Sequence, residues 1–344
     1  MADMRKILFL GNLPTADKRS VGGATLITQT VYNQLKANKK LHIKFHRIRK
    51  KWRPKFQLFD YARLFFRLPF LIKKSDGILV ASSWDFMFFM LPVIIFWSKI
   101  FHKPVYYLLI GSKFISYFSR LPGFYQNVLI KALKGVDVLW VETKRQIAFL
   151  KELGVLQVAW MPNSRKRTGG VFQEPSMKNK YVFISRVAKS KGIDILLKVF
   201  QQLPDKTLDI FGPLIDYTIK DFKRFNNVHY KGMLRSEEVE KKLKEYDFLL
   251  LPTRHPEGYP GIIVEAFAAG TPVIATPMGG IPEILVHNKN GILLAKDDPV
   301  DELREVLEKM NPEKRRHLAR GAYLSFEHFD ADKNYRKISE YLQQ

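Results

Sequence analysis

Two glutamates, Glu257 and Glu265, stand eight positions apart in the segment HPEGYPGIIVEAFAAGTPVIATPMGGIP, residues 255–282. Gly258 and Gly261 leave the backbone bare beside the first carboxylate, so N–H groups can approach a ligand closely. The arrangement predicts one carboxylate at a helix N-terminus, a second inside that helix, and N–H groups in a positive field. Such a site suits an anion that also carries hydroxyl groups, as a nucleotide sugar does. A single Glu near a helix start is more often a solvated acid, and only the whole segment favours a ligand site.

The elements expected to position these acids are a loop, a helix, a turn and a strand. Pro260 can open the helix, because a residue of the first turn has no N–H partner to lose. Apolar residues then follow at helical spacing; they are Ile262, Ile263, Ala266, Phe267 and Ala269. Gly270 ends the helix, and residues 272–275 are expected to form a buried strand.

The segment resembles the Glu-x7-Glu signature of the retaining GT-B glycosyltransferases, family 4 in particular, and residues 279–283 (Gly-Gly-Ile-Pro-Glu) extend the likeness. The resemblance implies an α/β fold of GT-B type, in which two Rossmann-like domains face a cleft and the C-terminal helix crosses back to the N-terminal domain. It implies that Glu265 holds the ribose hydroxyls of the donor and that Glu257 lies at the transferred sugar. The implied donor-binding residues around them are Gly258, Tyr259, Pro260 and Gly261.

Two cations follow the strand predicted at 181–185, and a helix is expected at 193–202. Between these elements, Arg186 and Lys191 can clamp a diphosphate, the guanidinium as a bidentate fork and the ammonium as a point charge. During transfer they would stabilise negative charge on the leaving nucleotide. The same Arg-x4-Lys-Gly spacing marks the pyrophosphate site of the resembling family. The alternative is a pair of loop charges in water.

A similar strand, loop and helix opens the chain. Residues 4–10 predict the strand, Gly22 and Gly23 lie in the loop, and the helix runs to about Leu35. The fingerprint of dinucleotide-binding proteins is missing, which argues against a nicotinamide enzyme. By resemblance, the paired glycines lie near the donor phosphate or the acceptor; otherwise they only give the loop its shape.

Two further donor contacts are expected, the first from its place at a strand end that faces the ligand crevice and the second from the resemblance. Gly212 ends the strand predicted at 208–211, and Met233 follows a later strand near the base of the donor. Many relatives carry a catalytic histidine after the strand expected at 104–110. The residues that follow that strand here include no histidine, so none is assigned a catalytic role.

The repeated pattern predicts two domains in 344 residues. The N-terminal, acceptor-binding domain is expected to span 1–164, with 330–344 packing back on it. The C-terminal domain, which binds the nucleotide sugar, is expected to span 165–329. A polar and basic stretch, 164–180, has the composition of a linker between them.

The composition limits the chemistry. Hydrophobic residues make up 46% of the chain, as in ordinary globular proteins, and the absence of cysteine excludes disulfides, thiolate metal sites and a Cys nucleophile. No Asp-x-Asp follows a predicted strand, and no His, Asp and Glu spacing suggests zinc. Neither a metal nor another cofactor is therefore expected, since the nucleotide sugar is a substrate. No secretory signal precedes the first strand, and a cytoplasmic location is expected.

The net charge of +24, from 57 basic and 33 acidic residues, implies an anionic partner. Residues 36–55 contain no acid, and residues 60–74 combine cations with aromatics, a composition expected beside anionic headgroups. The apolar run 86–97 is about half the length that spans a bilayer, and a buried helix explains it better than a membrane-dipping surface. A peripheral position on the inner face of the plasma membrane is expected.

These inferences favour a metal-independent, retaining hexosyltransferase. The donor would be a nucleotide diphosphate sugar, UDP-sugar favoured and GDP-sugar possible, and the acceptor a hydroxyl of a lipid-linked or membrane-associated glycan. Synthesis of a bacterial surface polysaccharide is the expected setting. One alternative is a nucleotide-sugar epimerase of GT-B fold. The other is a nucleic-acid-binding protein, suggested by the charge alone; the sequence shows no DNA- or RNA-binding module, and no nucleic-acid partner is expected.

Overall fold

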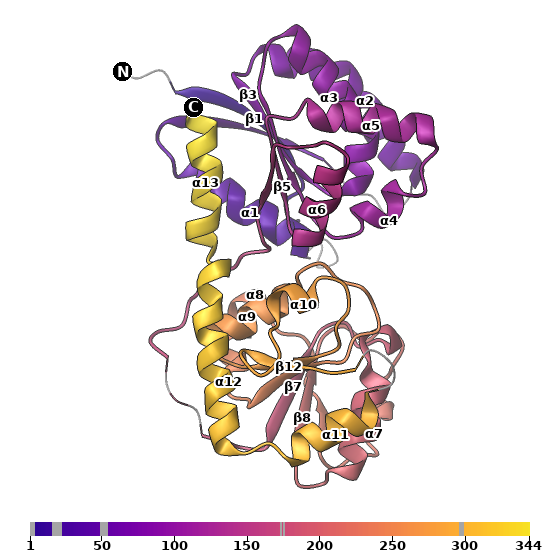
Figure 1. Ribbon diagram of the computed structural model, residues 1–344, viewed down its shortest axis with the longest axis vertical. Coiled ribbons are helices and arrows are strands. Elements are labelled where there is room, and N and C mark those ends of the chain that lie inside the picture. The colour runs from indigo at the N-terminus through magenta and orange to yellow at the C-terminus, as the bar shows by residue number, and fades with distance from the viewer. Residues whose placement is uncertain (1–3, 16–22, 49–53, 173, 175, 296–298) are drawn as a thin grey trace. The chain divides into compact units, whose positions relative to one another are not determined.

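The computed structural model describes residues 4–15, 23–48, 54–172, 174, 176–295 and 299–344 (Figure 1). The chain divides into two compact units. The first unit joins Met1–Pro162 with Ala331–Gln344, and the second is Asn163–Asp330. Each unit is built on one six-stranded parallel sheet flanked by helices, which confirms the predicted α/β class with two similar folds in tandem.

The sheet of the first unit has the strand order β2-β1-β3-β4-β5-β6. Its strands are β1 (Arg5–Gly11), β2 (Leu41–Arg47), β3 (Gly77–Ser82), β4 (Val105–Leu109), β5 (Val138–Val141) and β6 (Val158–Trp160). The chain moves outward from β1 to β2 and then continues on the other side of β1 with β3. Ligands of parallel α/β sheets bind beyond the carboxyl ends of the strands where the order reverses, here between β1 and β3.

Helices cover both faces of this sheet. One face carries α1 (Gly23–Lys36) and α13 (Ala331–Gln343), so the last helix belongs to the first unit (Figure 1). The other face carries α2 (Pro54–Lys73), α3 (Trp84–Ile100), α4 (Phe114–Phe118), α5 (Gly123–Lys134) and α6 (Lys144–Glu152). Alternate side chains of β1 pack on opposite faces of the sheet. Leu8 and Leu10 face α3, while Ile7 and Phe9 face α1 and α13.

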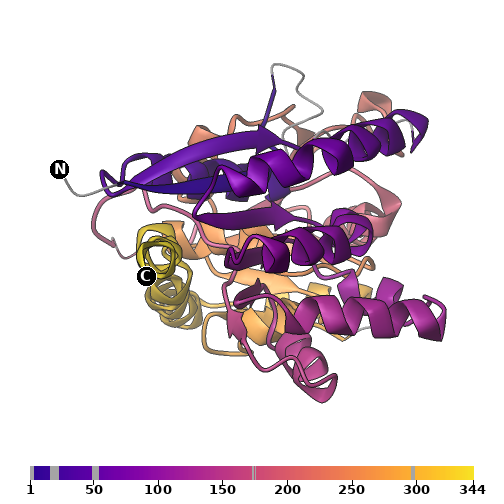
Figure 2. The same ribbon diagram turned by 90° about the horizontal axis from the view of Figure 1, so that it is seen from above.

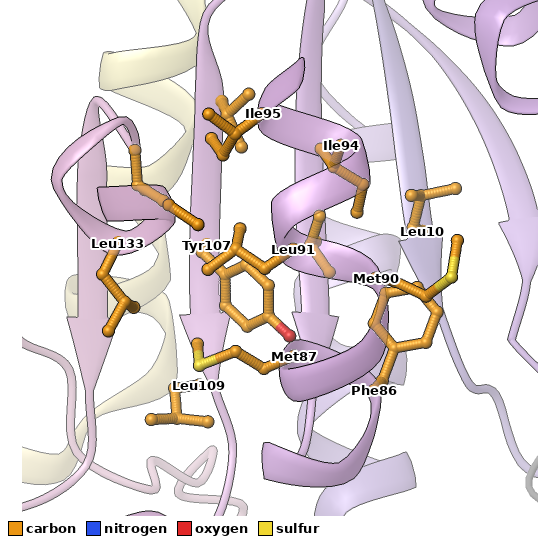
Figure 3. Packing of buried hydrophobic residues seen from close by; sticks show 14 of the residues in the cluster. Leu10, Phe86, Met87, Met90, Leu91, Ile94, Ile95, Tyr107, Leu109 and Leu133 are labelled. Atoms are coloured by element: carbon orange, nitrogen blue, oxygen red, sulfur yellow. The ribbon is translucent and has the colours of Figure 1, made fainter. Parts of the chain in front are cut away.

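Helix α3 confirms the interpretation of the apolar run 86–97 as a buried helix. Figure 3 shows Phe86, Met87 and Leu91 packed over the sheet beside Tyr107. The burial is one-sided, however, because Phe89 and Phe96 on the outer side are more than half exposed.

The sheet of the second unit has the order β12-β11-β10-β7-β8-β9, which reverses between β7 and β10. Its strands are β7 (Lys180–Ile184), β8 (Thr207–Phe211), β9 (Val228–Tyr230), β10 (Phe248–Leu251), β11 (Val273–Ala275) and β12 (Gly291–Leu293). Its helices are α7 (Ile193–Gln202), α8 (Ser236–Leu243), α9 (Gly261–Ala269), α10 (Ile281–Ile284), α11 (Val300–Glu308) and α12 (Pro312–Ser325). The ligand rule therefore points to the loops that follow β7 and β10.

The stretch expected to be a free linker is instead bound to the second unit. The backbone N–H groups of Thr168 and Gly169 each donate to the buried carboxylate of Glu240, at 2.6 Å. The guanidinium of Arg167 lies 3.8 Å from the ring centre of Tyr323. Composition suggested a linker because polar residues dominate, but these polar groups have partners on α8 and α12. Residues 164–169 are thus part of the second unit.

None of the described helices is both long enough and apolar enough to cross a membrane.

Candidate active site

The two loops at the strand-order reversal of the second unit contact each other through a glycine. The loop after β7 ends in a short 3-10 turn, Lys189–Lys191, followed by Gly192. Gly192 has a φ of 77°, and a Cβ atom there would overlap the carbonyl oxygen of Pro252, directly after β10. Only glycine allows both the left-handed backbone and this close approach. The side chain of Lys191 is thereby held against the loop that carries Glu257.

Lys191 and Glu257 form an ion pair, Nζ to Oε1. The lysine side chain is 4% exposed and the glutamate side chain 22% exposed, so the pair lies at the edge of the protein interior. The sequence predicted both residues as site residues, and the structure brings them into direct contact. A positive and a negative group in one partly desolvated place can hold both a phosphate oxygen and a sugar hydroxyl.

The loop of Glu257 is closed by the glycines that extended the sequence likeness. The N–H of Gly280 donates to the carbonyl oxygen of Glu257 at 2.8 Å, and Gly279 has a φ of 62°. Tyr259 is buried, and its hydroxyl donates to the carboxylate of Glu283 at 2.6 Å. Tyr259 therefore contributes to the shape of the loop through its ring and hydroxyl.

Glu265 lies on the second turn of α9, whose N-terminus is formed by Pro260 and Gly261. Its Oε1 accepts a hydrogen bond from Nε of Arg165 at 2.8 Å. Arg165 comes from the segment that enters the second unit, one hundred positions earlier in the sequence. Sequence reasoning missed Arg165, because residues 164–180 suggested a linker.

The remaining predicted site residues follow the carboxyl ends of β7, β8, β9 and β10. Arg186 is exposed just beyond β7. Gly212 follows β8 with a φ of 139°, and a Cβ there would overlap the carbonyl oxygen of Ser185. Met233 follows β9 and is 60% exposed. Gly258 lies beside Glu257 in the loop after β10, partly exposed.

A second ion pair stabilises this region, and no sequence motif predicted it. Both terminal nitrogens of Arg254 donate to the carboxylate of Asp194 in the first turn of α7, at 2.7 and 2.9 Å. Burial alone would raise the pKa of Asp194, but the hydrogen bonds and positive charge of Arg254 outweigh it and hold that pKa below its usual value. The pair joins the loop after β10 to the helix after β7.

The first unit has a cavity of about 100 Å³ at its own strand-order reversal. Its polar lining follows β1 and β3 and includes the start of α1: Asn12, Thr25, Thr28, Ser82, Ser83 and Asp85. Ser83 donates to the carboxylate of Asp85, and Ser82 Oγ lies 2.5 Å from the hydroxyl of Tyr107. Gly22 and Gly23 were the predicted site residues of this region, and the residues that line the cavity were not predicted. Gly23 begins α1 and is exposed, whereas Gly22 lies outside the described residues, as does the 49–53 part of the basic run.

Within the described part of the chain, no group of three or more His, Asp or Glu side chains could hold a metal ion.

The comparison that bears most directly on this site concerns residues 178–310, which match the family "Glycosyl transferases group 1". That stretch runs from β7 to α11 and contains Lys191, Glu257 and Glu265. We call residues 178–310, which match this family model, the group 1 domain. The recognition of a glycosyltransferase signature in the sequence is confirmed at this level.

Curated relatives match over part of the chain. An uncharacterized glycosyltransferase of Methanocaldococcus jannaschii is 32% identical over 139 residues, which is 39% of this chain and 39% of the relative. The putative colanic acid biosynthesis glycosyltransferase WcaL of Salmonella typhimurium is 27% identical over 138 residues, 36% of this chain and 34% of the relative. The chain thus spans only about a third to two fifths of the length of these relatives in alignment.

The fold is matched along the whole chain. HepE of Anabaena, solved in complex with UDP, superposes with a TM-score of 0.74 at 18% identity, covering 98% of this chain and 99% of HepE. This likeness confirms the predicted GT-B fold, with a Rossmann-like sheet in each unit.

Proposed function

We propose that the protein is a retaining glycosyltransferase that moves a hexose from a nucleotide diphosphate sugar to a hydroxyl group. The observation that carries the proposal is the Lys191–Glu257 pair at the strand-order reversal of the group 1 domain. UDP-sugars are the favoured donors and GDP-sugars the second choice. The crystals of HepE, a structural neighbour, contain UDP and, in another case, UDP-glucose, which supports uracil as the first base to test.

In the proposed reaction each charged side chain has one task. Glu265 accepts hydrogen bonds from the ribose hydroxyls, and Glu257 accepts them from the hydroxyls of the sugar. Lys191 and Arg186 neutralise the diphosphate as its bond to the sugar carbon breaks. The leaving group departs ahead of attack on the same face, so stabilising its charge matters more than a strong base. These cations take the place of a metal, and activity is expected to survive EDTA.

Thermal-shift measurements with a panel of nucleotide sugars test the donor class. A ligand present at 100 times its dissociation constant stabilises the folded state by about 2.7 kcal/mol, enough to raise the melting temperature measurably. We expect UDP-sugars to do so, or failing them GDP-sugars. An unchanged melting temperature with every nucleotide sugar would contradict the proposal. An epimerase of the same fold would convert a UDP-sugar with no acceptor present, whereas the transferase leaves its configuration unchanged.

We further propose a lipid-linked or membrane-held glycan as the acceptor, in the synthesis of a bacterial surface polysaccharide. WcaL, which is 27% identical over 138 residues, is described as a putative colanic acid biosynthesis glycosyltransferase. Such an acceptor requires the enzyme at the cytoplasmic face of the membrane, attached peripherally to anionic lipid. The first unit has a surface suited to that task.

The surface, here called the aromatic face, is the outer side of α2, α3 and α5, three neighbouring helices on one side of the first sheet (Figures 1 and 2). Its exposed apolar side chains are Phe59, Phe65, Phe66, Phe70, Phe89, Phe96, Ile100, Phe124 and Val128. Four of these phenylalanines are more than 65% exposed. Water-facing aromatic side chains in such number are unusual on a soluble surface and indicate an interaction site.

Positive charge surrounds these aromatics. Arg63, Arg67 and Lys73 are exposed on α2 between the phenylalanines. The pKa of His46 is lowered, first by burial and then by the positive charges of Arg67, Arg63 and Lys44, which shows that these cations gather beside β2. A surface that combines aromatic rings with cations suits the interface of an anionic bilayer.

Flotation with liposomes tests this surface. Replacing Phe66 and Phe70 together by Ser is expected to weaken binding to anionic vesicles about tenfold or more, because each ring buried in the interface contributes up to about 2 kcal/mol. Leu324→Ser is the matched control, since Leu324 is 63% exposed but lies on α12 of the second unit. Equal flotation of the double variant and the control, or wild-type protein left at the bottom at low salt, would count against membrane attachment by this face.

A further inference from the structure

Arg165 makes hydrogen bonds through both its side chain and its backbone, and one of its partners is Glu265. Its side chain is 15% exposed, and that of Glu265 is 21% exposed. Nε donates to Oε1 of Glu265 at 2.8 Å, while Nη1 donates to the side chain of Asn163 and, at 3.0 Å, to the carbonyl oxygen of Ser164. The guanidinium is therefore fixed on two sides, and its orientation does not depend on the glutamate alone.

The backbone of Arg165 is fixed as well. Its N–H donates to the carbonyl oxygen of Phe329 at 3.0 Å, in an isolated bridge with Asp330. Asn163 in turn donates from Nδ2 to the carbonyl oxygen of Tyr259 at 2.9 Å. The arginine is thus anchored to the loop of Glu257 and contacts Glu265, so a single residue connects the surroundings of both signature glutamates.

The start of α9 is shaped to admit this side chain. A Cβ atom at Gly261 would overlap Nη2 of Arg165 and lie 2.8 Å from its central carbon. Any residue larger than glycine at this position would displace the guanidinium. Glycine at position 261 therefore has a structural role that the sequence did not reveal. It leaves room for an arginine side chain beside the helix that carries Glu265.

We propose that Arg165 is a positioning residue that holds the Glu265 carboxylate in the orientation needed to read the ribose of the donor. Nε of Arg165 donates to Oε1 of Glu265, and among the described residues no hydrogen bond to Oε2 of Glu265 is found. A carboxylate fixed in this way presents its second oxygen as a preorganised acceptor for a ribose hydroxyl. The inference rests on the proposed function, because it assumes that the ribose of a nucleotide sugar binds at Glu265.

The test compares UDP with 2′-deoxy-UDP by calorimetry. If Glu265 accepts from the 2′-hydroxyl, the wild-type protein binds UDP about tenfold or more tightly than the deoxy form, as expected for a hydrogen bond to a charged acceptor. Arg165→Gln is expected to reduce this preference to about twofold or less. Arg165→Lys keeps the charge but not the planar fork and is expected to restore only part of the preference. Glu265→Gln combined with Arg165→Gln is expected to lose no more than Glu265→Gln alone.

Arg167→Gln is the control for a merely structural effect. Arg167 belongs to the same segment, stacks on Tyr323 and Phe326, and donates to the carbonyl oxygen of Tyr323 at 2.9 Å. Its loss is expected to lower the melting temperature while leaving the preference for UDP unchanged.

The possible outcomes separate the two proposals. If the wild-type protein binds neither UDP and 2′-deoxy-UDP nor GDP and its deoxy form, the proposed function is overturned, and this inference with it. Binding of UDP by the wild type with an undiminished ribose preference in Arg165→Gln overturns only the role of Arg165. An equal loss of affinity for both nucleotides would mean that the guanidinium binds phosphate directly, which also overturns the positioning role.

Discussion

Replacing Lys191 by Met is expected to lower the turnover number for glycosyl transfer about a thousandfold, the size of effect seen when a group that stabilises transition-state charge is removed. Lys191 is the buried cation of the site, and Glu257 is its partner. In the proposed reaction the departing diphosphate gains negative charge, and the ammonium group of Lys191 is expected to stabilise it. The measurement is transfer of labelled sugar to an acceptor, or hydrolysis of the donor when no acceptor is known.

The same substitution has a cost in stability that must be separated from catalysis. Removing one member of a partly buried ion pair leaves an uncompensated charge, which lowers the free energy of unfolding by about 3 kcal/mol. Lys191→Met with Glu257→Gln removes both charges, so the double variant is expected to regain most of the lost stability but none of the activity. Folding and catalysis are thereby measured independently.

Lys189→Met supplies the matched control for charge. Lys189 lies two residues earlier in the same 3-10 turn but is exposed. Its replacement removes one positive charge from the same loop and is expected to change the turnover number no more than about twofold. Comparable losses from both lysines would mean that general electrostatic attraction, rather than a clamp at Lys191, accounts for activity.

The regular elements were predictable because their signals are local. Strands buried on both faces are continuous apolar runs, and β10 and β4 consist entirely of buried residues. The helix expected at 193–202 is observed with those limits, because Gly192 precedes it and its apolar residues keep the helical period. The same locality made the 255–282 segment recognisable, since loop, helix and strand follow one another without interruption.

Partners distant in sequence could not be predicted. Arg165 and Glu265 are one hundred positions apart, and the pairing exists only because the segment of Arg165 lies against the start of α9 in the folded chain. A basic stretch has the same composition whether it is a free linker or part of a site. The cavity beside Ser83 and Asp85 was missed for a related reason, because its lining comes from the ends of β1, β2, β3 and β4 and from residues of α1, α2 and α3.

Aromatic residues show a further limit of composition. Phe88 and Phe89 are neighbours in an apolar run, yet Phe88 is 4% exposed and Phe89 57% exposed. The apolar run alone favoured a buried helix. The orientation of α3 on the sheet, which the sequence does not specify, leaves one side of the helix exposed. The apolar residues of α2 divide in the same way, since Leu64 and Leu68 are buried in the core while Phe66 and Phe70 are exposed.

Gly279→Ala is expected to destabilise the second unit by more than about 2 kcal/mol and to raise the KM for the donor. The φ of 62° is costly for alanine, and the new Cβ would overlap the carbonyl oxygen of Glu257. Because both sides of this contact are backbone, no side-chain rotation can relieve it. The loop must move, and Glu257 moves with it. Thermal unfolding and donor kinetics measure the two effects, with a fall in melting temperature of about 5 °C or more.

Two other glycines divide this effect into its parts. Gly111 has a φ of 95° but no atom within 4 Å of an added Cβ, so Gly111→Ala measures backbone strain without overlap. Gly23 has neither a positive φ nor a close neighbour, and Gly23→Ala at the start of α1 is expected to be neutral or to stabilise by about 0.5 kcal/mol. If Gly279→Ala costs no more than Gly111→Ala, the close approach of residues 257 and 279 is not what holds the loop. A larger cost, together with a raised donor KM that neither control shows, means that the glycine pair exists to keep Glu257 in place.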